Sequence, residues 1–89
     1  MERHETQIIN RLGLHARAAA EVVKLATTFE ASVKIHRSDE VANAKTIMGL
    51  LMLGATQGTA VVVETTGVDE VQAAAALVAL IDARFNELE

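Results

Sequence analysis

The alternation of apolar and polar residues divides the chain into seven predicted elements. Alternating and β-branched stretches predict strands over residues 5–10, 31–37, 41–43 and 59–66. Apolar residues at helical spacing predict helices over residues 16–28, 46–54 and 70–86. Because a sheet with one apolar face needs helices to cover it, the order βαββαβα predicts an α+β fold. We expect a four-stranded antiparallel sheet with helices packed on one face and the other face in contact with solvent.

The same periodicities predict which side chains face the core. In the strand over residues 31–37, Val33 and Ile35 point to one side, while Ser32, Lys34 and His36 point to the other. In the first predicted helix the residues expected to be buried are Val22, Val23, Ala26 and Phe29. In the second they are Ile47, Leu50 and Leu51. In the third they are Val71, Ala74, Val78, Ile81 and Phe85.

Polar and glycine residues predict the helix ends. Thr46 and Asp69 are the expected N-caps of the second and third helices, and Gln72 is placed to form a capping box with Asp69. Gly54 is expected to end the second helix, because glycine readily adopts the left-handed conformation that follows many helices.

Length, composition and charge narrow the class of protein. The 89 residues are enough for one small domain, spanning residues 1–89, and there is no cysteine for a disulfide or a thiolate metal site. The net charge of −4, without a basic stripe or stacking aromatics, argues against nucleic-acid binding. No apolar stretch approaches the roughly 20 residues that cross a bilayer, and no secretion signal opens the chain. We expect a cytoplasmic monomer with no membrane contact.

The stretch GLHAR at 13–17 carries the strongest chemical signal. His15 falls at the start of a helix, where unpaired N–H groups and the helix dipole attract anions. Gly13 lets the preceding loop bend, and Arg17 adds a planar cation suited to phosphate. The positive helix end also disfavours the imidazolium form, which leaves a ring nitrogen nucleophilic. These residues predict a histidine that accepts a phosphoryl group and receives its charge.

The plain alternative is that His15 is a polar cap and Arg17 a solvated charge, but the combination with Gly13 favours the phosphoryl site. His4 and His36 are expected to be exposed. The three histidines show no helical spacing of metal ligands, so the sequence predicts neither a metal nor another cofactor.

The segment IMGLLML at 47–53 has more apolar residues than a short helix can bury. Met48 and Met52 lie one turn apart and are expected to form an exposed patch, because methionine repacks easily against partners. The alternative is that the whole segment is core. Thr46 is both a potential phosphorylation site and a cap, and capping is the simpler role.

Two motifs in this order of elements, GLHAR at 13–17 and AKTIMGLLMLG at 44–54, resemble the HPr family of histidine phosphocarriers of the bacterial phosphoenolpyruvate-dependent phosphotransferase system. The resemblance covers essentially the whole chain. It implies the family fold, an α+β open-faced β-sandwich with a four-stranded antiparallel sheet covered on one face by three helices. It implies that His15 is phosphorylated on Nδ1 by enzyme I, using phosphoenolpyruvate, and passes the group to an EIIA protein or domain. It also implies that Arg17 assists the transfer, in a carrier that turns over no substrate alone.

The resemblance further implies two surfaces for partners and control. Thr46 stands where many members carry the serine that HPr kinase/phosphorylase phosphorylates. Met48 and its neighbours match an apolar docking patch. The candidate partner-binding residues are Ala16, Ala20, Lys24, Ile47, Met48, Leu51 and Met52.

Some features depart from the commonest family pattern. Ala18 stands where proline is usual, and alanine suits the first turn of a helix. GLHARAAA is more similar to proteobacterial and nitrogen-regulatory (NPr-like) members than to sugar-transport members. Two alternatives therefore stand beside the carrier: a nitrogen-type regulatory carrier acting mainly through partner binding in signalling, and a ferredoxin-like sensor of small molecules. The sensor gives no reason for His15 and Arg17 at a helix start.

Overall fold

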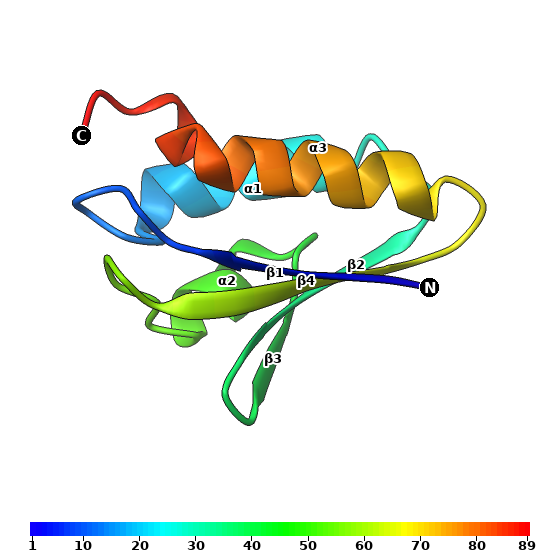
Figure 1. The fold of residues 1–89 in the computed structure, drawn as a ribbon, viewed down its shortest axis with the longest axis horizontal. Coiled ribbons are helices and arrows are strands. Elements are labelled where there is room, and N and C mark those ends of the chain that lie inside the picture. The colour runs from blue at the N-terminus through cyan, green and yellow to red at the C-terminus, as the bar shows by residue number, and fades with distance from the viewer.

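The computed structural model describes residues 1–89, which form four strands, three α-helices and one short 3₁₀ turn (Figure 1). In chain order the elements are β1 (Glu2–Gln7), α1 (Ala16–Ala26), β2 (Ser32–Arg37), β3 (Glu40–Asn43), α2 (Ile47–Met52), β4 (Ala60–Thr66), α3 (Glu70–Asp82) and η1 (Arg84–Asn86). This order confirms the predicted succession of elements and the α+β class.

All four strands form one antiparallel sheet in the order β1-β4-β2-β3. The alternation seen in the sequence sets the two faces: Val33 and Ile35 of β2, with Val61 and Val63 of β4, are buried on the helical side. Lys34 of β2 points to the other face and is exposed. The sheet is therefore open on one side, as the periodicity predicts.

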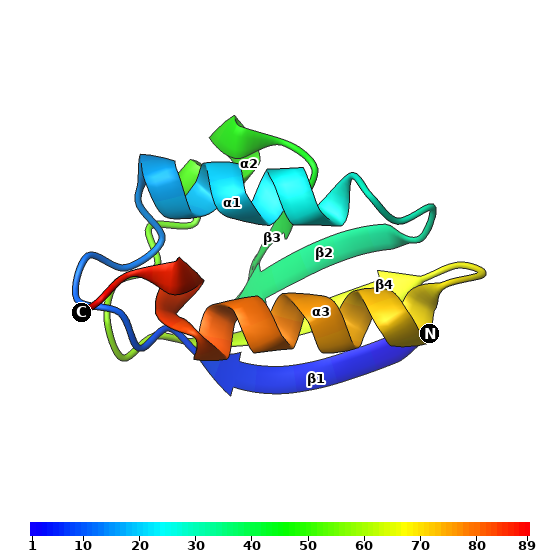
Figure 2. The same cartoon turned by 90° about the horizontal axis from the view of Figure 1, so that it is seen from above.

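The helices lie on the apolar face of the sheet. Viewed from above, α1 and α3 lie side by side and run roughly along β1 and β4, while α2 lies beside α1 (Figure 2). The buried stripes of the two long helices consist largely of small residues, which let the helices approach the sheet closely: Ala18, Ala19, Val22 and Ala26 on α1, and Ala73, Ala74, Leu77 and Ile81 on α3. No helix is long and apolar enough to cross a membrane.

The first strand lies earlier than predicted. It spans Glu2–Gln7 and not residues 5–10. As an edge strand it carries polar residues on both faces, so it lacks the apolar alternation that marks a strand. The prediction placed the strand around the apolar residues Ile8 and Ile9. In the structure these two residues follow the strand, where the chain leaves the sheet.

The predicted end of the first helix is wrong by two residues. α1 stops at Ala26, and the hydroxyls of Thr27 and Thr28 donate hydrogen bonds back to the carbonyls of Lys24 and Leu25. Such bonds compete with continued helix. Val22 and Ala26 are buried as expected, whereas Val23 and Phe29 are only half-buried.

The third helix also ends early, at Asp82 and not at residue 86. Arg84, Phe85 and Asn86 all have positive φ angles, between 52° and 65°, so the chain turns back on itself. Phe85 is fully buried, as predicted. Val71 is 59% exposed and Val78 half-buried, and Leu77 supplies the buried contact instead.

The second helix confirms Leu50 as core but corrects its neighbours. Ile47 is 42% exposed and Leu51 half-buried, while Leu53, just past the helix, is buried. Six residues make fewer than two turns, so only one side of the helix meets α1 and β3. The helix spans Ile47–Met52 and not residues 46–54, and Gly54, the residue after the C-cap Leu53, adopts the expected positive φ of 61°.

Neither predicted N-cap accepts a hydrogen bond on its side chain from the helix that it precedes. The Thr46 hydroxyl donates to the carbonyl of Asn43, at 3.1 Å. The Asp69 carboxylate instead accepts hydrogen bonds from the amides of Glu30 and Ala31, which ties the loop after α1 to the start of α3. These bonds lower the pKa of Asp69 against the opposing effect of burial. Glu70, not Gln72, caps the preceding turn by accepting from Gly67.

The loop that leads into α1 is fixed by Gly13. This residue has a φ of 69°, and its backbone lies against that of Ala55 and Thr56. A Cβ at this position would stand 2.6 Å from the carbonyl oxygen of Ala55. Next to it, the Leu14 amide donates to the same oxygen, at 2.9 Å. The bend and the close approach both require glycine.

We expect Gly13→Ala to lower the free energy of unfolding by more than the roughly 1–2 kcal/mol that left-handed backbone costs an L-residue. Gly54→Ala is the matched control, because Gly54 also has positive φ but has open space where the Cβ would stand. Urea unfolding followed by circular dichroism measures both. Equal losses for the two variants would contradict the close approach at Gly13.

Candidate phosphoacceptor site

His15 occupies the N-cap position of α1 in extended conformation, as the sequence predicts. Its carbonyl accepts the first helical hydrogen bond, from the Ala19 amide at 2.8 Å. The amides of Ala16, Arg17 and Ala18 make no hydrogen bond, because they lie in the first turn and the His15 side chain does not cap them. The helix start therefore offers free donors and a positive dipole end beside the imidazole.

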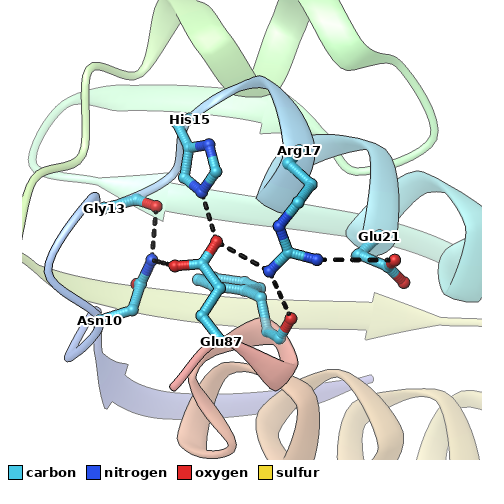
Figure 3. Close-up of polar contacts among 7 residues, drawn as sticks. Asn10, Gly13, His15, Arg17, Glu21 and Glu87 are labelled. Carbon is cyan, nitrogen blue, oxygen red and sulfur yellow. Dashed lines mark hydrogen bonds and ion pairs between the residues drawn. The ribbon is translucent and has the colours of Figure 1, made fainter. Parts of the chain in front are cut away.

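The His15 ring contacts a carboxylate from the far end of the chain. Its Nε2 atom bonds to Oε2 of Glu87, although 72 residues separate the two in sequence (Figure 3). The other ring nitrogen, Nδ1, has no hydrogen-bond partner and points away from Glu87 in this view. The imidazole is thus held through one nitrogen and free at the other.

Arg17 holds the same carboxylate from the helix side. Its Nη2 atom lies 2.8 Å from Glu87 Oε2 and donates to the carbonyl of Phe85 at 3.0 Å. Its Nη1 atom lies 4.0 Å from Glu21, one turn along α1. The structure therefore brings His15 and Arg17 together, as predicted, but through a shared anion of the chain itself.

Asn10 completes the network from beneath the loop. Its side chain is fully buried, and Nδ2 donates both to the Gly13 carbonyl and to Glu87 Oε1, each at 2.8 Å. Its Oδ1 atom has no partner. Asn10 thus links the loop before α1 to the C-terminal segment.

Three donors around one carboxylate set its ionisation. Burial raises the pKa of the Glu87 carboxyl, but hydrogen bonds from His15, Asn10 and Arg17 lower it by more, to about 2 against an ordinary 4.5. Glu87 is therefore an anion throughout the physiological range. Beside it, a hollow of about 420 Å³ opens to solvent, lined by Arg11, Leu12, His15, Arg17 and the segment 86–89.

The predicted docking residues lie beside this site on α1 and α2, which pack together. Met48 and Met52 are 68% and 74% exposed, as their spacing predicts. The remaining candidates are exposed apart from half-buried Leu51, and they are Ala16, Ala20, Lys24 and Ile47. Thr46 is also exposed. Of the other histidines, His4 is exposed, but His36 is half-buried and lies 3.0 Å from Glu64, which corrects the expectation for it.

The family model described as "PTS HPr component phosphorylation site" matches residues 2–83. The chain belongs to the HPr family. It is 49% identical, over the full length of both chains, to the phosphocarrier protein HPr of Cupriavidus necator. It is 41% identical to the phosphocarrier protein NPr of Shewanella violacea, over 98% of this chain and 94% of that one.

The fold agrees with that of solved HPr proteins. A crystal structure of HPr from Thermoanaerobacter tengcongensis superimposes with a TM-score of 0.95 at 39% identity, over 100% of both chains. HPr membership confirms the resemblance seen in the two motifs and makes the protein a phosphocarrier component of the phosphotransferase system. It also removes the ferredoxin-like sensor as an alternative.

The sequence reasoning missed Glu87 and Asn10. Glu87 comes just after the predicted helix over residues 70–86, which in the structure has already ended at Asp82. No local pattern in the sequence indicates that its carboxylate contacts His15, 72 positions earlier. Asn10 lies three residues before Gly13, and its backbone carbonyl accepts from the Gly13 amide. That spacing marks a turn but not a buried side chain.

We expect the Glu87 contacts to make stability depend on pH in acid. Because its folded pKa lies below the unfolded value of about 4.5, the stabilisation is complete above that pH and disappears as the pH falls toward 2. Glu87→Gln should therefore be less stable than the parent near pH 6, by about 1.5–3 kcal/mol.

The two proteins should converge near pH 2, which urea unfolding at a series of pH values measures. Glu5→Gln, at an exposed carboxylate without partners, is the control and should follow the parent. A gap that stays constant from pH 6 to pH 2 would contradict the assignment.

Proposed function

We propose that the protein accepts a phosphoryl group from phosphorylated enzyme I on His15 and passes it to an EIIA protein or domain. The observation that carries the proposal is the place of the imidazole. His15 lies at the start of α1, beside three unpaired amides and the guanidinium of Arg17. HPr membership supports the class of chemistry.

The surroundings of His15 suit a group that must be held and then released. A helix end stabilises an anion by about 0.3–1 kcal/mol, and a hydrogen bond from a charged donor adds about 1.5–3 kcal/mol. Arg17 is half-exposed and reaches its present partners over the helix surface, so it can turn toward a phosphoryl group on the neighbouring ring. Such stabilisation steadies a phosphohistidine without making it inert.

The protein has the features of a carrier and not of an enzyme. The hollow at His15 opens to solvent and is lined mainly by polar and charged side chains. Chemistry would take place only when a partner covers the site. A nitrogen-type carrier is the second candidate, since an NPr protein is 41% identical over nearly the whole chain.

Labelling from phosphoenolpyruvate and purified enzyme I tests the function. We expect the parent protein to take up phosphate in an acid-labile, base-stable form and His15→Ala to take up none. His4→Ala is the matched control and should be labelled like the parent, because His4 lies on β1, away from the site. Using sugar-type and nitrogen-type enzyme I in parallel identifies the branch. Absence of labelling with both would overturn the carrier function.

Partners dock, in this proposal, on the face formed by α1 and α2 beside His15, defined by Ala16, Ala20, Lys24, Ile47, Met48, Leu51 and Met52. Two methionines that are more than two-thirds exposed give this face an apolar centre next to the reacting ring. Thr46 stands at its border with an exposed hydroxyl. Phosphorylation there, by a kinase of the HPr kinase/phosphorylase type, would place about two negative charges against the apolar centre and weaken docking.

We expect Met48→Ser to raise the Kd for enzyme I by about tenfold or more, because it removes one methionine side chain that docking would bury. Thr46→Asp should raise the Kd by a similar factor, because it adds a negative charge beside the apolar centre. Isothermal titration calorimetry measures the affinity. Val68→Ser is the control for Met48, because Val68 is 85% exposed in the loop between β4 and α3, outside α1 and α2. Thr46→Val, which lacks only the hydroxyl, should bind normally. Equal effects of Val68→Ser and Met48→Ser would contradict this docking face.

A further inference from the structure

The contact between His15 and Glu87 determines which ring nitrogen carries the proton, as well as how the ring is oriented. Glu87 accepts from Asn10 through Oε1 and from Arg17 through Oε2, both at 2.8 Å, so the carboxylate is ionised and can only accept. Its bond to His15 Nε2 therefore requires a proton on that nitrogen. A neutral imidazole with a proton on Nε2 carries its lone pair on Nδ1.

We propose that Glu87 is a positioning residue for phosphoryl transfer: its carboxylate, held by Asn10 and Arg17, keeps the proton of His15 on Nε2 and presents the lone pair of Nδ1 to the phosphoryl donor. This inference rests on the proposed function. It adds to that function a residue from the C-terminal segment which none of the sequence motifs contains.

The step balances without moving a proton. The Nδ1 lone pair attacks phosphorus, the bond between phosphorus and the donor breaks, and its electron pair stays with the donor. The His15 ring then holds a phosphoryl group on Nδ1 and a proton on Nε2, with one positive charge. Glu87 already lies against that proton, so the new charge is paired as it forms.

The same contact favours the onward transfer. When an acceptor attacks phosphorus, the bond from Nδ1 breaks and the ring leaves as a neutral imidazole, still protonated on Nε2. Without the carboxylate, the ring more readily loses the Nε2 proton and would leave as an imidazolate, a far poorer leaving group. Glu87 thus keeps the phosphoryl group reactive while the free amides of α1 hold it.

The arrangement of neighbouring groups makes Glu87 the one carboxylate that serves His15. The charged residues around the ring are Glu87 and Glu89 on the C-terminal segment, Arg11 in the loop, and Arg17 and Glu21 on α1. Glu89 is paired with Arg11, and Glu21 faces Arg17. The buried amide of Asn10 further holds Glu87 in place, since it bridges the carboxylate and the Gly13 carbonyl.

Phosphorylation kinetics with enzyme I and phosphoenolpyruvate test the proposal. We expect Glu87→Gln to slow both uptake and onward transfer by about ten- to a hundredfold, the loss of one charge-assisted hydrogen bond. Glu87→Asp, which keeps the charge, should recover part of the rate. Asn10→Ala should give a smaller loss. Glu5→Gln, at an exposed carboxylate on β1 outside the site, is the control and should react like the parent. Circular dichroism at the assay pH checks that each variant is folded.

Two further measurements separate positioning from a merely structural role. In ¹⁵N NMR spectra of the neutral ring, we expect the proton of His15 to reside on Nε2 in the parent and to be shared between both nitrogens in Glu87→Gln. Hydrolysis of the phosphorylated proteins should remain fast to a higher pH in the parent than in Glu87→Gln, because the carboxylate retains the Nε2 proton.

Each outcome has a definite meaning. A faster Glu87→Gln would overturn the proposal and show instead that the carboxylate blocks Arg17. An unchanged rate or an unchanged proton position would overturn it as well. If the parent protein takes up no phosphate, the proposed function fails, while the NMR measurement still decides whether Glu87 places the proton of His15.

Discussion

Burial of Phe85 is the constraint on which the site depends. The chain leaves α3 at Asp82 and passes through three left-handed residues, each costing about 1–2 kcal/mol in backbone strain. Full burial of a phenylalanine returns about 1.5–3 kcal/mol, which does not offset three such residues alone. The charge-assisted bonds that Glu87 makes with His15, Arg17 and Asn10 also hold the chain after this turn in place. The C-terminal turn and the functional site therefore stabilise each other.

This coupling explains why a small, alanine-rich core can hold a precise site. Alanine stripes on α1 and α3 bring both helices close to the sheet, and the turn after α3 then reaches the start of α1 (Figure 2). From the other side, Gly13 lets the loop before α1 lie against the backbone of Ala55, just after α2. His15 is thus held by the C-terminal segment, by the loop before α1 and by α1 itself. Of its two ring nitrogens, only Nδ1 has no partner.

The polar groups at His15 have opposing effects that together suit reversible transfer. The helix start favours negative charge on the reacting side of the ring, where a phosphoryl group would sit. Glu87 favours positive charge on the opposite nitrogen. A carrier needs both, because it must stabilise the group it receives and still release it to an acceptor. The exposed side chains of Met48 and Met52 on α2 take no part in these charged contacts.

The sequence by itself determined the succession of elements, the buried side of β2, the position of His15 at a helix start and the exposure of Met48 and Met52. These properties follow from local periodicity and from the chemistry of single residues, which the chain carries wherever it folds. Only the tertiary structure decided the left-handed turn at residues 84–86, the polar edge strand β1, the use of Asp69 to bind a distant loop, and the meeting of Asn10, His15, Arg17 and Glu87. Each of these goes against local preference or joins residues far apart in sequence. They form because packing of the whole core offsets the cost of locally unfavourable conformations, and patterns of neighbouring residues carry no information about that packing.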